Sequence, residues 1–310
     1  MHLAGVSPRA FLRIAQTTVG LVVLNIVTGA AVRLTDSGLG CPDWPTCSQH
    51  HLTPPLSFHP VVEFANRLVV VVLCVGAAAA FGAAWARVPR RRDLLWLSGG
   101  LLGGVLAEAV LGAVVVYTKL NPYVVMTHFM VGMALLTDAT VLALRAGRAP
   151  GPAGPPKVGR RVVLLSRLTL GLLAVAMVAG TATTGAGPHA GGKGAKRIPV
   201  ALSDMARLHS GIVLVVVGLT VLVLGLLTRG GAPASVLDRA RVMLGAMVTQ
   251  GVIGYTQYFS HLPALLVGVH VLGATVVWVA AVWFVDGLSH HGAEDLPDTA
   301  GPATTVLVPR

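Results

Sequence analysis

Charged residues are scarce in this sequence: 11% of its 310 residues are Asp, Glu, Lys or Arg, while 54% are hydrophobic. A soluble protein of this composition would expose far more apolar surface than folded soluble proteins do. Apolar runs of the length needed to cross a bilayer, about 20 residues, recur along the whole chain. The scarcity of charge therefore excludes a soluble protein and predicts an integral membrane protein in contact with lipid.

The sequence also lacks a basic helix or a soluble domain that could carry its positive charge, which amounts to a net +11. Nucleic-acid binders concentrate Lys and Arg on such an element, so we expect no nucleic-acid partner. Polytopic membrane proteins instead gather Lys and Arg in their cytoplasmic loops. We attribute the excess positive charge to these loops.

Cysteine is rare as well, with three in the chain. Cys41 and Cys47 share one loop segment, and Cys74 lies in an apolar run. A loop pair keeps a disulfide in an oxidising compartment and not in the cytosol. The side of the membrane that this loop faces therefore decides whether the pair is oxidised.

The apolar runs predict an all-α, polytopic fold with eight transmembrane helices, over residues 11–33, 61–86, 94–117, 122–145, 162–184, 205–228, 236–259 and 263–288. If the N-terminus lies inside, most of the 23 Lys and Arg residues fall in inner segments. The positive-inside rule then places both termini in the cytoplasm of a bacterial plasma membrane. The loop with Cys41 and Cys47 faces outward under this orientation.

A Gly/Pro-rich segment divides the chain into two halves of four spans each. The predicted parts are residues 1–148, a cytoplasmic linker over 149–161, residues 162–288 and a disordered cytoplasmic tail over 289–310. Gly112 and Gly254 are 142 residues apart, and so are His128 and His270. We therefore predict two pseudo-symmetric four-helix bundles, related by an axis along the membrane normal.

Histidines inside membrane spans are costly and mark functional sites. His128, His209 and His270 lie in the fourth, sixth and eighth spans, which all run from outside to inside. Each follows the start of its span by about 4–7 residues, or about 6–11 Å of depth. The second span has Asn66 at the matching depth. The second half therefore offers a histidine pair, and the first half offers an Asn/His pair.

Facing histidines in an apolar four-helix bundle are suited to axial ligation of haem iron, whereas zinc and copper sites usually recruit Cys or carboxylates as well. Arg67 and Arg207 lie beside the candidate positions, either to pair with haem propionates or as ordinary interfacial arginines. Glu63 shares a helix face with Asn66, either to act on the bound group or to reach the interface. We expect Glu108, and its counterpart Gln250 142 residues later, to form hydrogen bonds between helices.

These residues resemble the haem A synthase family. The most specific stretch is residues 29–47, GAAVRLTDSGLGCPDWPTC, with support from QGVIGY at residues 250–255 and from Glu63, Asn66 and Arg67. The resemblance extends over nearly all eight spans. It implies an oxidoreductase that converts the C8 methyl group of haem O to a formyl group, giving haem A for terminal oxidase assembly.

The resemblance also implies roles for individual residues. His209 and His270 would bind a haem b cofactor, with Arg207 beside them, and the first half would hold the substrate haem O at His128, Asn66 and Arg67. Glu63 matches the proposed catalytic carboxylate, and Cys41 and Cys47 match a loop disulfide. The family commonly has histidine where this chain has Asn66. Since an amide is a poor iron ligand, we expect the substrate iron to have His128 as its one protein ligand.

The resemblance implies haem O synthase and cytochrome oxidase assembly factors as partners, together with an electron donor that the sequence does not identify. The main alternative is a haem b electron-transfer subunit of the quinol-linked cytochrome b type, which would need two equivalent histidine pairs. A transporter with a duplicated fold would need broken helices at the bilayer midplane, and the even-numbered spans show no such break.

Overall fold

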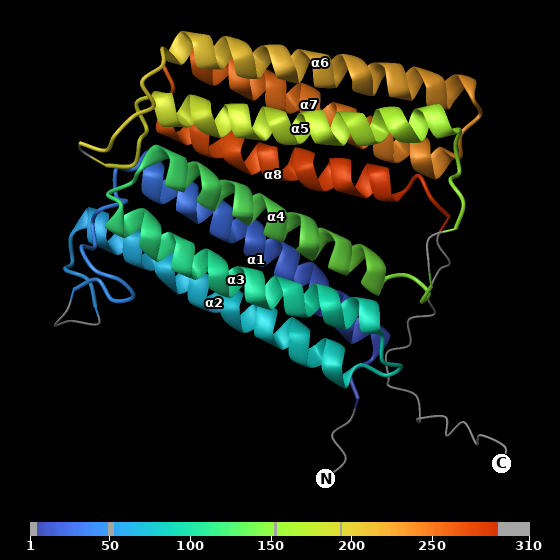
Figure 1. Cartoon of the computed structure of the whole chain (residues 1–310), viewed down its shortest axis with the longest axis horizontal. Helices are drawn as coiled ribbons and strands as arrows, with labels where there is room; N and C mark the ends of the chain where they lie inside the picture. Colours follow the sequence, from blue (N-terminus) through green and yellow to red (C-terminus); the bar gives the residue numbers. More distant parts are fainter. Residues whose placement is uncertain (1–4, 49–52, 152–153, 193, 291–310) are drawn as a thin grey trace.

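The computed structural model describes residues 5–48, 53–151, 154–192 and 194–290, and this part of the chain contains eight α-helices (Figure 1). They are α1 (Pro8–Leu34), α2 (Phe58–Ala86), α3 (Arg92–Tyr117), α4 (Pro122–Ala146), α5 (Arg160–Ala186), α6 (Leu202–Arg229), α7 (Ala234–Phe259) and α8 (Ala264–Asp286). The predicted all-α fold is confirmed, and each helix lies within a few residues of its predicted span. The predicted disorder of the tail concerns residues that, from 291 onward, lie outside the described part.

Seven of these helices are long and apolar enough to cross a membrane, and α7 is the exception. Its first turns contain Asp238, Arg239 and Arg241, which lower its hydropathy. It nevertheless has 26 residues and lies antiparallel between α6 and α8 (Figure 1). Because α6 ends where α7 begins and α8 starts at the opposite end, α7 has to cross the same thickness. The chain is therefore a multi-pass membrane protein.

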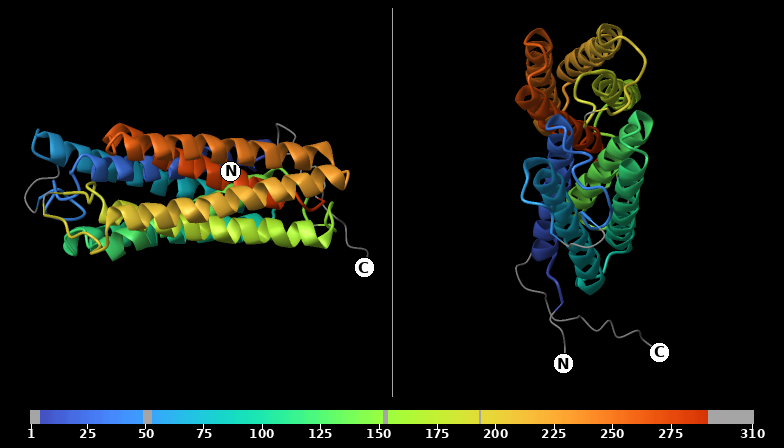
Figure 2. Two further views of the ribbon diagram at one scale, coloured as in Figure 1. Left: turned by 90° about the horizontal axis from the view of Figure 1, so that it is seen from above. Right: turned by 90° about the vertical axis from the view of Figure 1, so that its left-hand side faces the viewer.

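The helices form two groups of four that lie side by side, with their axes roughly aligned (Figures 1 and 2). Helices α1–α4 form one group and α5–α8 the other. At the junction, α1 and α4 pack against α8, and α4 also contacts α5. The predicted division into residues 1–148 and 162–288 stays a prediction, and α5 begins at Arg160, inside the expected linker over 149–161.

The turns that join α3 to α4 and α7 to α8 have the same backbone. Lys119 and Leu120 have φ values of 55° and 59°, and His261 and Leu262 have 64° and 58°. Left-handed conformations are uncommon for residues other than glycine, so two consecutive pairs at the same 142-residue offset indicate a shared turn geometry. This agreement supports the predicted repeat, while the pseudo-symmetry of the halves as a whole stays a prediction.

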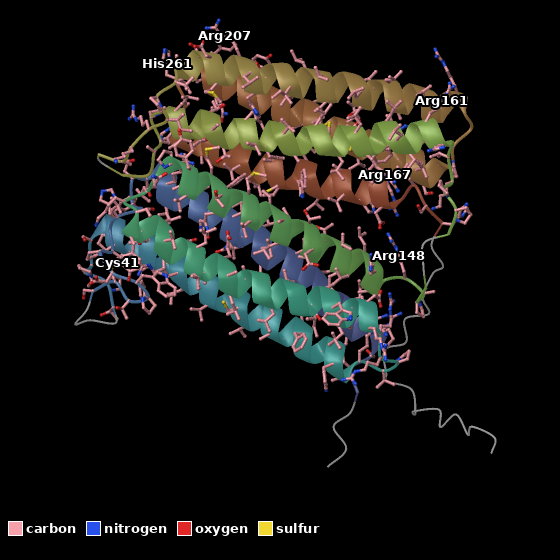
Figure 3. All side chains as sticks on the ribbon, viewed as in Figure 1. Cys41, Arg148, Arg161, Arg167, Arg207 and His261 are labelled. Carbon is pink, nitrogen blue, oxygen red and sulfur yellow. A yellow bond between two sulfur atoms is a disulfide. The ribbon has the colours of Figure 1, made fainter. Side chains whose placement is uncertain are left out.

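Charge is distributed unequally between the two ends of the bundle. Arg148, Arg161 and Arg167 lie toward one end, and Cys41 and Arg207 lie at the other (Figure 3). At the arginine-rich end, Arg148 Nη1 donates a hydrogen bond to Asp286 Oδ1 at 2.7 Å. This ion pair joins the segment after α4 to the end of α8 and so connects the two groups of helices.

Candidate functional site

A cavity of about 1280 Å³ extends through both groups of helices toward the end that contains Cys41. Its lining includes Asn66, His128, His209 and His270, together with many aliphatic side chains. Typical small-molecule pockets measure about 300–1,000 Å³, so this cavity is large enough for a bulky apolar ligand in more than one place. The structure thus brings all four of these predicted positions to one continuous space.

In the second half, His209 on α6 and His270 on α8 face each other with their ring centres 6.5 Å apart and their planes at 81°. Two imidazoles on opposite sides of one metal ion, each with a bond of about 2 Å, have their ring centres about 6 Å apart. His209 Nδ1 lies 2.9 Å from the carbonyl oxygen of Ala176. A ring that donates Nδ1–H to this oxygen keeps the Nε2 lone pair for a metal.

Glycines on the neighbouring helices leave room for these two rings. A Cβ at Gly180 on α5 would lie 3.0 Å from Cε1 of His209, and one at Gly254 on α7 would lie 2.9 Å from Cε1 of His270. Any other residue at either position would push against the imidazole. The sequence marks Gly254 only as the repeat position of Gly112, and the tertiary structure shows its contact with the His270 ring.

In the first half, Asn66 on α2 and His128 on α4 occupy the corresponding places. Asn66 Oδ1 accepts a hydrogen bond of 2.8 Å from the hydroxyl of Thr28. Gly29 faces Asn66, and Gly112 faces the His128 ring, at 3.9 Å and 3.7 Å from a Cβ built on each glycine. In both halves a glycine on the neighbouring helix therefore faces each candidate ligand position, more loosely in the first half, where an amide replaces one imidazole.

Glu63 and Arg67 bind the loop that contains the two cysteines. Cys41 and Cys47 form a disulfide, and the backbone N–H of Cys41 donates a 2.8 Å hydrogen bond to Glu63 Oε2. Arg67 Nη2 donates to Glu63 Oε1 at 2.6 Å, and its Nη1 donates to the carbonyl oxygens of Asp43, Pro45 and Thr46. Glu63 is 5% exposed and lines the cavity, so a fixed carboxylate lies at the edge of the first-half site.

Arg207 differs from Arg67 in its surroundings. Its side chain is 77% exposed and forms an ion pair of 3.0 Å with Asp204, one turn earlier on α6. Arg207 also contributes to the cavity lining. It therefore stands at the rim, where it is free to turn toward a bound anion.

For two polar residues, only the tertiary structure shows what they contact at the cavity. Arg33, in the last turn of α1, lines the cavity, and its Nε donates a 2.9 Å hydrogen bond to the carbonyl oxygen of His189. Glu108 on α3 lies 3.1 Å from Nδ1 of His128. In the sequence, the only indication of a function for Arg33 is that it is a lone cation at the end of an apolar span. For Glu108, the indication is the cost of burying an acid. The expectation of a bond between helices is confirmed for Gln250, which donates to the carbonyl oxygen of His270 at 2.7 Å.

The donor set suits a metal that arrives with most of its own ligands. Within the described part of the chain, no group of three or more His, Cys, Asp or Glu is placed to hold a bare metal ion. The iron of a haem requires one or two axial protein ligands, since the porphyrin supplies the others. One facing histidine pair, one single histidine and a mainly aliphatic cavity fit haem iron.

Fold and site together define a multi-pass helical membrane protein with a histidine-lined cavity suited to haem. A profile of the cytochrome oxidase assembly protein family matches residues 13–61 and 57–191. The chain is 39% identical over 140 residues to a protein of Geobacillus kaustophilus named Heme A synthase, a match that covers 43% of each chain. A protein of the same name from Azorhizobium caulinodans is 26% identical over 345 residues, or 91% of this chain and 96% of the relative.

The chain belongs to this cytochrome oxidase assembly protein family, that of the haem A synthases. The family resemblance inferred from the sequence is thereby confirmed. The match to the Geobacillus kaustophilus relative spans less than half of that relative's length.

Proposed function

We propose that this protein is a haem A synthase, an oxidoreductase that converts the C8 methyl group of haem O to a formyl group. This conversion removes four electrons from the methyl carbon, which pass to an external acceptor, and adds one oxygen atom from dioxygen or water. The observation that carries this proposal is the inequality of its two sites. His209 and His270 have the spacing of a bis-histidine haem site, whereas the corresponding first-half place pairs His128 with Asn66 and lies near a buried carboxylate. An electron carrier with two equivalent haems has no need of such a difference.

The second half would hold a haem b cofactor between His209 and His270. When bound there, haem b supplies one-electron transfer to the neighbouring site. The Nδ1 contact of His209 with the Ala176 carbonyl fixes the orientation of that ring. Gly180 and Gly254 leave the space in which both rings stand. Arg207 at the rim is our candidate for pairing with a propionate.

The first half would hold the substrate, haem O, with His128 as the one protein ligand of its iron. The amide oxygen of Asn66 accepts a hydrogen bond from Thr28. In this proposal the Asn66 amide forms part of the pocket wall and is not an iron ligand. Glu63 is the candidate catalytic residue, because its carboxylate can stabilise positive charge that develops at the methyl carbon and accept the proton that leaves. Arg67 holds Glu63 and the disulfide loop, and its pairing with a substrate propionate stays a prediction.

The proposed location is a bacterial plasma membrane, with both termini in the cytoplasm. The arginines at the linker end and the disulfide at the opposite end support this orientation (Figure 3). Haem O synthase, which would supply the substrate, and cytochrome oxidase assembly factors, which would receive the product, remain proposed partners.

The decisive experiment is to express the chain with a source of haem O and to extract and identify the haems. Formation of haem A supports the proposal, and haem b alone in two low-spin sites would favour the electron-carrier alternative. His270→Ala should abolish retention of haem b. Glu63→Ala should stop turnover while haem stays bound, and retained activity in this variant would remove the catalytic role of Glu63.

A further inference from the structure

A buried carboxylate stands beside the single histidine of the first half. Glu108 on α3 is 6% exposed, and its Oε1 lies 3.1 Å from Nδ1 of His128 on α4. Its other oxygen, Oε2, has no hydrogen-bond partner within the described part of the chain. Burying an acid at this depth carries a large desolvation cost, and the proposed reaction makes no use of it.

The second half differs at the corresponding position. Gln250, 142 residues after Glu108, donates a hydrogen bond to the backbone carbonyl oxygen of His270. Nδ1 of His270 has no hydrogen-bond partner among the described residues. A carboxylate therefore lies at the ring only in the half where one histidine has no opposing imidazole.

The contact between Glu108 and His128 is close, but its geometry is not that of a hydrogen bond. The two atoms are within hydrogen-bonding distance, whereas Nδ1 of His128 makes no hydrogen bond of good geometry among the residues that the structure describes. The His128 side chain is 35% exposed and faces the cavity. A Cβ at Gly112 would lie 3.7 Å from its Cε1, which is ordinary contact. The ring thus has room to turn, and hydrogen bonds at such sites often tighten when the ligand binds.

We propose that Glu108 is a positioning residue that accepts a hydrogen bond from Nδ1–H of His128 and directs the Nε2 lone pair to the iron of the substrate. This inference rests on the proposed function. In a bis-histidine site, two opposed rings fix the iron together. With Asn66 opposite, His128 has to be oriented by something else, and a carboxylate both fixes the tautomer and makes the imidazole a stronger donor.

The test compares Glu108→Gln with the parent in the full-length purified protein, loaded with ferrous protohaem as the probe. The variant is nearly isosteric and places in the first half the residue that the second half already has at Gln250. Resonance Raman of the five-coordinate haem reports the iron–histidine stretch of the first half. The low-spin bis-histidine spectrum of the second half reports folding in the same sample. Asp138→Asn is the matched control, since it removes a carboxylate from the helix of His128, ten residues further along.

We expect Glu108→Gln to lower the iron–histidine stretching frequency and to weaken first-half haem binding by about 10–100-fold. The second-half spectrum of Glu108→Gln should match that of the parent, and Asp138→Asn should match the parent in both halves. Glu108→Asp keeps a carboxylate, so its loss should be smaller than that of Glu108→Gln. An unchanged stretch at normal occupancy would overturn the inference, and formation of haem A would still support the proposed function. A parent protein with no five-coordinate haem would instead refute the first-half substrate site itself, and the inference with it.

Discussion

Replacing Gly254 by alanine tests how tightly the structure seats the histidine pair. A Cβ at residue 254 would lie 2.9 Å from Cε1 of His270, whereas carbon atoms in contact prefer about 3.5–4.0 Å. The ring must therefore retreat by roughly 0.6–1 Å. The atom in conflict is the far end of a side chain beside a cavity, so the haem-free protein relieves the contact by turning the ring. We expect folding to change little.

The cost appears when the ring has to bind iron. A site of this kind requires its ligands to lie within about 0.5 Å of the productive geometry. The displaced imidazole lies outside this range. We expect Gly254→Ala to weaken haem binding at His209 and His270 by roughly 10–100-fold, or about 1.4–2.7 kcal/mol. Titration of haem-depleted protein with ferric haem, followed by the low-spin absorption spectrum, measures this directly. Circular dichroism should show unchanged helix content.

Gly245→Ala is the matched control on the same helix, at a position outside the cavity lining. A Cβ at this position has no atom within 4 Å, and alanine favours a helix over glycine by up to about 1 kcal/mol. We expect parent affinity and equal or slightly higher stability. If Gly254→Ala binds haem as tightly as Gly245→Ala, the argument that glycine seats the ring is wrong.

Two further predictions concern the loop and the orientation. Arg67→Met removes the donor to three loop carbonyl oxygens and to Glu63, so we expect a loss of about 3 kcal/mol in unfolding free energy. The control is Arg241→Met, because the Arg241 side chain is 59% exposed. This change should lower the unfolding free energy by no more than about 0.5 kcal/mol. Equal losses in the two variants would contradict the role of Arg67. For the orientation, cysteines placed at the exposed Ser235, in the first turn of α7, and Ser260, just after its last residue, should react differently with an impermeant maleimide in intact cells. Labelling of Ser260→Cys alone is expected, and labelling of Ser235→Cys alone would reverse the proposed topology.

The sequence by itself determined the class of fold, the number of helices and the depth of the histidines. Apolar runs are long, bounded by Pro, Gly and charged residues, and each backbone bond in a membrane span has to be satisfied within the helix. Depth then follows from the rise per residue. For this reason His128, His209 and His270 could be placed at one level, and Asn66 could be matched to them, before any packing was known.

The direction of each side chain was decided only by the tertiary structure. In a soluble helix the apolar stripe shows which face packs inward, but lipid is as apolar as the interior of the bundle, so hydropathy does not distinguish the two faces. The rotation of each helix about its axis decides which side chains meet. It determines the contact of Glu108 with His128, the contacts of the glycines with the histidine rings and the hydrogen bonds of Arg67 to the loop. These contacts join a helix to another helix or to a loop, and they separate the half with two facing imidazoles from the half with one.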